Sequence, residues 1–277
     1  DECGEVKHKA RFGAKGFIQR YGIDYEETFA PTSQISSVRM LCQAAIDQNL
    51  DIYQMDVKSA YLNATIDKEI FVKTPKGFSE KDDNGDDLVW KLKKSLYGLK
   101  QSGRIWNECI NNSFLSMGFQ RSQADACIYV KSSDQGKVIV LVWVDDILIA
   151  SNSQDLLNDV KSRLCSKYDM KDLGKINSFL GIDFTVGEGE ISMSQDKYCE
   201  KLLSKFHMSE CKPRSFPCST DLDKNCDNSP PFKNVKVYQE LIGSLIYLMT
   251  SSRPDISYVV TRLSQKMSSP SELDWAV

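Results

Sequence analysis

Residues 138–150, VIVLVWVDDILIA, place two adjacent carboxylates in the middle of the most hydrophobic stretch of the chain. Seven apolar residues precede Asp145 and Asp146, and four follow them. Two fully buried strands explain the apolar runs, and the acids between them then form a tight hairpin turn. Asp suits turns, but a two-residue turn with positive φ favours Gly or Asn. Two charges at the mouth of an apolar hairpin also cost desolvation, so we expect cations to neutralise them.

A divalent cation such as Mg²⁺ fits this demand, because it takes oxygen ligands from carboxylates and from substrate phosphates. Residues 51–57, DIYQMDV, alternate as a strand does and bring Asp56 to the end of that strand. A third carboxylate on a neighbouring strand would let two metal ions, roughly 4 Å apart, clamp the attacking and leaving oxygens of a phosphoryl transfer. The alternative is a structural turn beside an unrelated strand aspartate.

Composition is that of a soluble globular protein of one large domain or two to three small ones. The chain has 277 residues, of which 41% are hydrophobic and 26% charged, and its net charge is −3. Two segments, 6–23 and 90–106, carry several Lys and Arg residues but no acid. Each could be a solvated face, yet two such segments together favour a polyanionic partner.

Location and redox state follow from what the sequence lacks. No apolar run approaches the roughly 18 residues of a membrane span, and the N-terminus is not a signal peptide, so we expect an intracellular protein without a membrane partner. Nine cysteines without a CxxC pair, and two histidines, make a zinc site improbable. Cys42 and Cys165 fall at apolar-periodic positions and are expected to be buried, reduced thiols. Because the chain begins and ends abruptly, we expect it to be a segment of a longer polypeptide.

Periodicity predicts a mixture of helices and strands. Amphipathic or helical patterns occupy 36–49, 104–117, 154–167, 196–206 and 238–267, two short strands flank a Gly-Glu-Gly turn within 179–193, and 211–232 reads as a linker. No regular βαβ rhythm appears, which favours the α+β class.

Two of these motifs resemble a known family. Asp-x-x-x-Ala-Tyr at 56–61, and an aromatic-Val-Asp-Asp hairpin about 90 residues later, are similar to motifs A and C of reverse transcriptases, most closely those of copia-type long-terminal-repeat retrotransposons. Further blocks in the same order cover nearly the whole chain: KARFGAKGFIQRYGIDYEETFAPT (9–32), QMDVKSAYLNA (54–64), KLKKSLYGLKQ (91–101), FLGIDF (179–184) and YQELIGSLIYLMTSSRPDISYVVTRLSQ (238–265).

The resemblance implies a right-hand polymerase with an antiparallel palm sheet that carries the catalytic carboxylates. Fingers would comprise 1–50 and 64–105, the palm 51–63 and 106–190, and a thumb or connection region 191–277, truncated before an RNase H domain. The implied activity is that of an RNA- and DNA-directed DNA polymerase, which adds dNTPs to a primer 3′-hydroxyl with two Mg²⁺ ions, or Mn²⁺ in their place. The implied partners are an RNA template, a DNA primer strand, and the RNase H and integrase regions of the same polyprotein. The implied location is a cytoplasmic virus-like particle whose DNA product reaches the nucleus for integration.

The resemblance also implies roles for individual residues. The catalytic, metal-binding set would be Asp56, Asp145 and Asp146, with Val57 beside the metal. The residues that would contact the dNTP are Lys9, Arg11, Lys15, Ala60, Tyr61 and Gly98. Tyr61 would act as a steric gate against a 2′-hydroxyl, and the backbone amides of 57–60 would hold the triphosphate. Template and primer would contact Lys100, Gln101, Trp143 and a primer-grip hairpin of Phe179, Leu180 and Gly181. Without the resemblance, Tyr61 is an ordinary core aromatic, Arg11 lies on a solvated strand edge, and 179–181 is plain core and turn.

Three departures from the family pattern leave the metal ligands intact. Trp143 stands where Tyr is usual, residues 102–106 read SGRIW where Ala-Pro-Arg-Ala-Trp is expected, and Gly13 replaces a branched apolar residue. Two alternatives to an active polymerase stay open. One is a catalytically inactive or domesticated descendant that binds nucleic acid, and the other is an unrelated metal-dependent phosphohydrolase.

Overall fold

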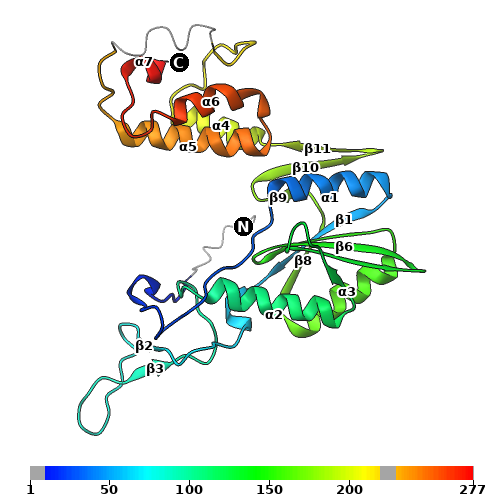
Figure 1. Cartoon of the computed structure of the whole chain (residues 1–277), viewed down its shortest axis with the longest axis vertical. Helices are drawn as coiled ribbons and strands as arrows, with labels where there is room; N and C mark the ends of the chain where they lie inside the picture. The colour runs from blue at the N-terminus through cyan, green and yellow to red at the C-terminus, as the bar shows by residue number, and fades with distance from the viewer. Residues whose placement is uncertain (1–9, 219–228, 277) are drawn as a thin grey trace, which may run out of the picture. The chain divides into compact units, whose positions relative to one another are not determined.

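The computed structural model describes residues 10–218 and 229–276, and the chain divides into two compact units between Ile176 and Asn177 (Figure 1). The first unit contains η1 (Gly16–Ile18), α1 (Ile35–Asp47), β1 (Asp51–Val57), η2 (Ala60–Asn63), β2 (Phe71–Lys73), β3 (Val89–Lys91), α2 (Ser102–Ser116), β4 (Gln120–Arg121), β5 (Ile128–Ser133), β6 (Gly136–Trp143), β7 (Asp146–Ser151), α3 (Gln154–Lys167) and β8 (Met170–Lys175). The second contains β9 (Ser178–Phe179), β10 (Ile182–Gly187), β11 (Glu190–Ser194), α4 (Asp196–Lys205), α5 (Val235–Ser251), η4 (Pro254–Ile256), α6 (Ser257–Ser264) and α7 (Glu272–Ala276). Each predicted helix and strand has a counterpart here, and the α+β class is confirmed.

A six-stranded sheet forms the centre of the first unit, within the part of the chain that the structure describes. Its strand order is β4-β5-β6-β7-β1-β8, and every neighbouring pair is antiparallel. The apolar residues of 138–150 other than Val144 lie in β6 and β7, which pair from Val138 opposite Ser151 to Trp143 opposite Asp146. Both strands are interior to the sheet, so their backbone groups are satisfied on both sides.

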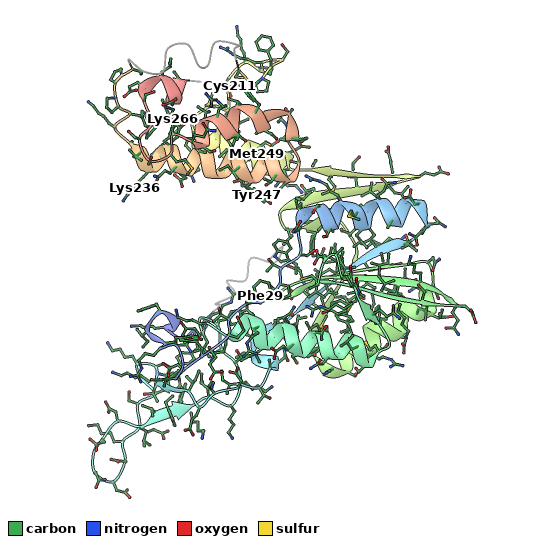
Figure 2. All side chains as sticks on the ribbon, in the orientation of Figure 1. Phe29, Cys211, Lys236, Tyr247, Met249 and Lys266 are labelled. Carbon is green, nitrogen blue, oxygen red and sulfur yellow. The ribbon has the colours of Figure 1, made fainter. Side chains whose placement is uncertain are left out.

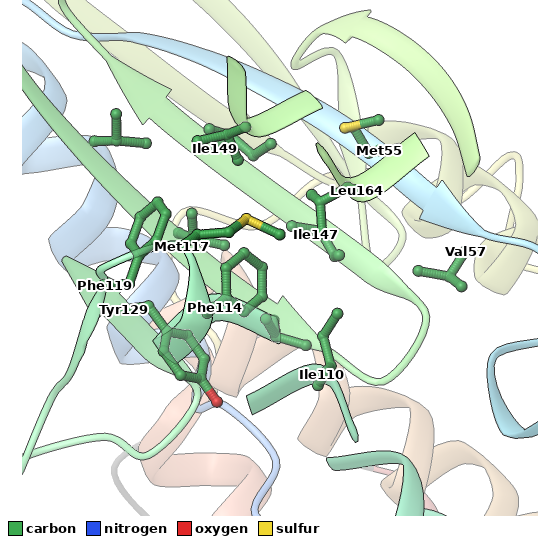
Figure 3. Packing of buried hydrophobic residues seen from close by; sticks show 14 of the residues in the cluster. Met55, Val57, Ile110, Phe114, Met117, Phe119, Tyr129, Ile147, Ile149 and Leu164 are labelled. Atoms are coloured by element: carbon green, nitrogen blue, oxygen red, sulfur yellow. The ribbon is translucent and has the colours of Figure 1, made fainter. Parts of the chain in front are cut away.

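Helices cover both faces of this sheet, which explains why the residues on either side of Asp145 and Asp146 are apolar without alternation. One face packs on α2 and α3, and Figure 3 shows Ile110 and Phe114 of α2 with Leu164 of α3 close to Ile147 and Ile149 of β7. The other face lies under α1 (Figure 1), whose stripe of Val38, Leu41, Cys42 and Ala45 is buried. Cys42 is thus buried as predicted, but Cys165 is exposed because it lies on the outer side of α3.

A distant carboxylate organises the start of α1. The carboxylate of Asp125 accepts hydrogen bonds from Ser33 Oγ at 2.8 Å and Ser37 Oγ at 2.6 Å. Burial raises the pKa of Asp125, whereas these two bonds and one from the Cys127 amide lower it. The hydrogen bonds together have the larger effect, so the pKa lies below its ordinary value. The ionised carboxylate therefore ties the N-terminal turn of α1 to the segment before β5.

The second unit combines a small sheet, β11-β10-β9, with helices α4 to α7. Its core is formed by α5 and α6, where Tyr238 donates from its hydroxyl to the carbonyl of Leu263 at 2.9 Å. In neither unit do the described residues include a helix with the length and hydrophobicity needed to cross a bilayer. The division into fingers, palm and thumb stays a prediction.

Candidate active site

The turn between β6 and β7 carries the paired acids, but it begins one residue earlier than predicted. Trp143 pairs with Asp146, so the two-residue loop consists of Val144 and Asp145. Asp146 is the first residue of β7, and the prediction of an Asp-Asp turn is wrong. Val144 has a φ of +56°, in the left-handed region that β-branched residues rarely adopt. The preference of Asp for turns therefore does not decide the position of this loop.

Donors from two other elements hold the loop. The Val57 amide, at the end of β1, donates to the carbonyl of Asp145 at 2.8 Å. The indole Nε1–H of Trp106, on α2, donates to the carbonyl of Val144 at 2.7 Å. Both donor residues are buried, which shields these bonds from competition with water. Trp106 was not among the predicted site residues, although it stands in the SGRIW block.

Asp56, Asp145 and Asp146 meet at one edge of the sheet, which is formed by the end of β1 and the loop between β6 and β7. Asp56 is the Cα partner of Asp146 across β1 and β7, and Asp145 lies in the adjoining loop. Burial raises the pKa of Asp146, and the charges of Asp145 and Asp56 raise it further. A hydrogen bond from Gln54 Nε2, at 3.4 Å, acts in the opposite direction. Negative charge is concentrated at this edge, which favours a bound cation.

The chemistry of the three carboxylates fits Mg²⁺, although their side chains are not preassembled around an ion. Among residues 10–218 and 229–276, no group of three His, Cys, Asp or Glu side chains is arranged to hold a metal. Carboxylate oxygens are nevertheless the hard donors that Mg²⁺ prefers, and the three backbone positions adjoin one another. Since like charges repel without a cation, side-chain rotation would accompany binding.

A pair of tyrosines lies beside the acids. Tyr61, in η2, and Tyr97 have ring centroids 4.6 Å apart and planes at 52°. Burial raises the pKa of both hydroxyls, and the charge of Asp145 raises each further. Both phenols therefore lie within electrostatic reach of the acidic edge. The sequence singled out Tyr61 alone, although Tyr97 directly precedes Gly98 in the SLYGLKQ block.

Close backbone contact attaches the basic segment to this tyrosine pair. The Ala14 amide donates to the Tyr97 carbonyl at 2.8 Å, and a Cβ at Gly98 would lie 2.1 Å from the Ala14 carbonyl oxygen. Gly98 is thus required where the sequence predicted close approach. Arg11 and Lys15 are exposed on either side of this contact, and the charge of Arg11 reaches the Tyr97 hydroxyl. The predicted contact of Lys9 lies outside the described residues.

The predicted template residues differ in accessibility. Gln101 is fully buried, its Oε1 accepts from Gln19 at 3.1 Å, and its Nε2 donates to the Asp24 carbonyl at 2.8 Å. Its side-chain amide is already bonded to the segment that contains Gln19 and Asp24, so contact with template would require these bonds to break. Lys100 is exposed, with its ammonium 5.0 Å from the centre of the Tyr25 ring. Trp143 is partly buried.

Two of the four amides predicted to hold the triphosphate are already engaged. The Val57 amide donates to Asp145, and the Lys58 amide donates to the carbonyl of Asp169 at 2.9 Å. Contact of either amide with the triphosphate would require its bond to break. The role of all four amides stays a prediction.

The predicted primer-grip residues form a hairpin turn in the second unit. Phe179 is buried and pairs with Ile182, while Leu180 and Gly181 both have positive φ, +52° and +74°. Tyr247, labelled on α5 in Figure 2, donates from its hydroxyl to the Leu180 carbonyl at 2.5 Å. The turn is thus fixed by a side chain that the sequence did not single out.

Sequence comparisons with known proteins agree on one family. The family model described as reverse transcriptase (RNA-dependent DNA polymerase) matches residues 1–220. The retrovirus-related Pol polyprotein from transposon TNT 1-94 of Nicotiana tabacum is 35% identical over 99% of this chain and 21% of its own length. The transposon Ty5-1 protein of Saccharomyces cerevisiae is 37% identical over 78% of this chain and 70% of its own length. A telomerase structure from Candida tropicalis aligns over 58% of this chain and 39% of its own, with 14% identity and a TM-score of 0.36. The chain spans about a fifth of the length of the Pol polyprotein it matches.

Proposed function

The chain belongs to the reverse transcriptase family of retrotransposon Pol polyproteins, as its motifs predicted, and we propose that it is the polymerase segment that adds dNTPs to a primer 3′-hydroxyl. The template would be RNA or DNA and the primer strand DNA. The observation that carries the proposal is the meeting of Asp56, Asp145 and Asp146 at one edge of the sheet. Family membership removes the reason to consider an unrelated phosphohydrolase.

Mg²⁺ would be held by Asp56 and Asp145, with Asp146 in support, and Mn²⁺ could replace it. When bound, two such ions would supply the positive charge that activates the primer hydroxyl and stabilises the transferred phosphoryl group. The sheet register supports this role, because paired strands fix the three backbone positions without further ordering. The pKa of Asp146 is raised by burial and by its two charged neighbours, and this supports the assignment because a cation would relieve the repulsion among the three acids.

The remaining groups would bind and orient the nucleotide. Arg11 and Lys15 would neutralise the triphosphate, since both are exposed beside the tyrosine pair. Tyr61 would stack beneath the sugar and exclude a ribonucleotide by steric clash with its 2′-hydroxyl. Lys100 and Trp143 would contact the template–primer duplex, and the turn at Leu180 would contact the primer.

The setting proposed for this activity comes from the relatives. Their names describe Pol polyproteins of transposons, so we propose that RNase H and integrase regions of one polyprotein act beside this segment. We place the reaction in a cytoplasmic virus-like particle, with transfer of the DNA product to the nucleus.

Primer extension tests the proposal directly. The purified chain is given oligo(dT) on poly(rA), dTTP and either Mg²⁺ or Mn²⁺, beside an Asp145→Asn variant. The matched control is Asp134→Asn, which changes an exposed aspartate in the β5–β6 turn. We expect metal-dependent extension that is lost in Asp145→Asn and retained in Asp134→Asn. A folded chain that binds the primer–template but extends it with neither metal would favour the inactive, nucleic-acid-binding alternative.

A further inference from the structure

We propose that Trp106 is a positioning residue for the polymerase reaction, whose indole N–H holds the strained loop that presents Asp145. This inference rests on the proposed function and deepens it, since Trp106 itself would touch neither metal nor nucleotide. Four observations support it: the backbone of Val144, the two hydrogen bonds of the loop, the burial of the indole, and the packing around the indole.

The loop is strained at Val144. A φ of +56° brings the Cβ of an L-residue close to the following carbonyl oxygen, and a β-branched side chain is the least suited to it. Gly or Asn would adopt this conformation at little cost. A valine stays there only when surrounding contacts over-determine the backbone, and such strain is concentrated at functional sites.

The two hydrogen bonds fix both peptide planes that flank Asp145. The carbonyl of Val144 belongs to the plane before Asp145 and accepts from Trp106 at 2.7 Å. The carbonyl of Asp145 belongs to the plane after it and accepts from the Val57 amide at 2.8 Å. With both planes held, the φ and ψ of Asp145 are set, and so is the direction in which its side chain leaves the backbone. The Val57 bond is an extension of strand pairing, whereas the Trp106 bond exists only because α2 brings an indole to this place.

The indole is itself rigid. Trp106 is 2% exposed and packs edge-on against Tyr168, with ring centroids 5.3 Å apart. The Tyr168 hydroxyl is 2.5 Å from Ser113 Oγ, which is fully buried. Indole has a single N–H donor, and in Trp106 it donates to the Val144 carbonyl. A phenylalanine would fill most of the same space but would leave the Val144 carbonyl without its partner.

The first test replaces the donor and keeps the aromatic ring. Trp106→Phe is compared with wild type and with a matched control, Trp275→Phe, which changes an indole stacked on Phe232 in the second unit. We expect kcat for dTTP incorporation to fall about tenfold in Trp106→Phe, which corresponds to about 1.4 kcal/mol for one hydrogen bond, while the KM for dTTP stays within about twofold. Trp275→Phe should match wild type in both parameters.

A second readout is independent of activity. The Val57 amide is bonded to the Asp145 carbonyl, so its hydrogen exchange reports whether the loop keeps its conformation. We expect this amide to exchange about tenfold faster in Trp106→Phe than in wild type. A fall in kcat without faster exchange at Val57 would show that the ring only packs, and it would overturn the inference.

Relief of strain gives the third test. In a Trp106→Phe background, Val144→Gly removes the penalty that the lost bond opposed, so kcat should recover by about threefold or more. If the double variant is no more active than Trp106→Phe, strain at Val144 is not what Trp106 opposes.

The wild-type chain alone keeps the inference testable if a variant fails to fold. The indole N–H of Trp106 should exchange most slowly of the four tryptophan indoles, and far more slowly than that of Trp90, which is 42% exposed. Exchange as fast as Trp90 would refute the bond. Primer extension separates the two claims: a wild type without activity defeats the proposed function, whereas an active wild type with unchanged Trp106→Phe kinetics defeats only this inference.

Discussion

Gly98→Ala tests how the basic segment is attached to the active site. The Cβ of an alanine at this position would lie 2.1 Å from the Ala14 carbonyl oxygen, and Gly98 has a φ of +94°. The contact is reciprocal, because a Cβ at Gly16 would lie 1.9 Å from the Gly98 carbonyl oxygen. Two glycines therefore allow backbone to lie directly on backbone. We expect Gly98→Ala to separate the two segments.

The magnitude has two parts. Placing an alanine at this φ costs roughly 1–2 kcal/mol, because its Cβ approaches the following carbonyl. Relieving the overlap requires Ala14 to move away, which breaks its 2.8 Å hydrogen bond to the Tyr97 carbonyl, a loss of about 1 kcal/mol. The sum is about 2–3 kcal/mol. The part caused by the overlap affects only the segment that carries Arg11 and Lys15.

The structure offers a matched control in Gly77. Its φ is +93°, almost that of Gly98, but no atom lies within 4 Å of the position of its Cβ. Gly77→Ala therefore carries the backbone strain without the overlap. Urea unfolding should show a loss of about 1–2 kcal/mol for Gly77→Ala and a larger loss for Gly98→Ala.

Steady-state kinetics then separates attachment from general stability. We expect the KM for dTTP to rise about tenfold in Gly98→Ala and to be unchanged in Gly77→Ala, because the first variant displaces the cations proposed to bind the triphosphate. Equal losses of stability and equal KM values in the two variants would refute the reasoning from close approach.

Three other side chains give distinct expectations. Asp125→Asn should lower the free energy of unfolding by about 1–2 kcal/mol at pH 7. Because hydrogen bonding takes the pKa of Asp125 below its ordinary value despite burial, the difference should be fully present above a pH of about 4 and shrink as the pH falls from there toward the lowered pKa, so urea titrations should show a smaller difference at pH 3 than at pH 7. Tyr97→Ala should reduce the preference for dTTP over UTP several-fold in kcat/KM, since Tyr61 loses the ring that supports it, and an unchanged ratio would remove Tyr97 from the gate. Tyr247→Phe should raise the Kd for primer–template about fivefold, as measured by fluorescence anisotropy, because the Leu180 turn loses its hydrogen bond; an unchanged Kd would argue against primer contact there.

Several features of this protein follow from local sequence alone. The apolar runs 138–144 and 147–150 indicated strands buried on both faces, and β6 and β7 are covered on both. The alternation of 51–57 gave a strand with those bounds, and it delivered Asp56 to the strand end. The resemblance of 56–61 and 143–146 to motifs A and C implied that Asp56 would meet the Asp145–Asp146 pair. These patterns report on burial and on strand periodicity, which act over a few residues.

Tertiary structure decided what depends on partners far along the chain. The loop falls at Val144 and Asp145 because donors arrive from Trp106, 38 residues away, and from Val57 on another strand. Gln101 is buried because its amide finds Gln19, 82 residues away, and no local pattern encodes that pairing. Tyr97 reaches Tyr61 only after the two segments pack together. Hydrogen bonds and ring contacts select among conformations that local preference leaves close in energy, so the fold sets the geometry of residues that the sequence had already supplied.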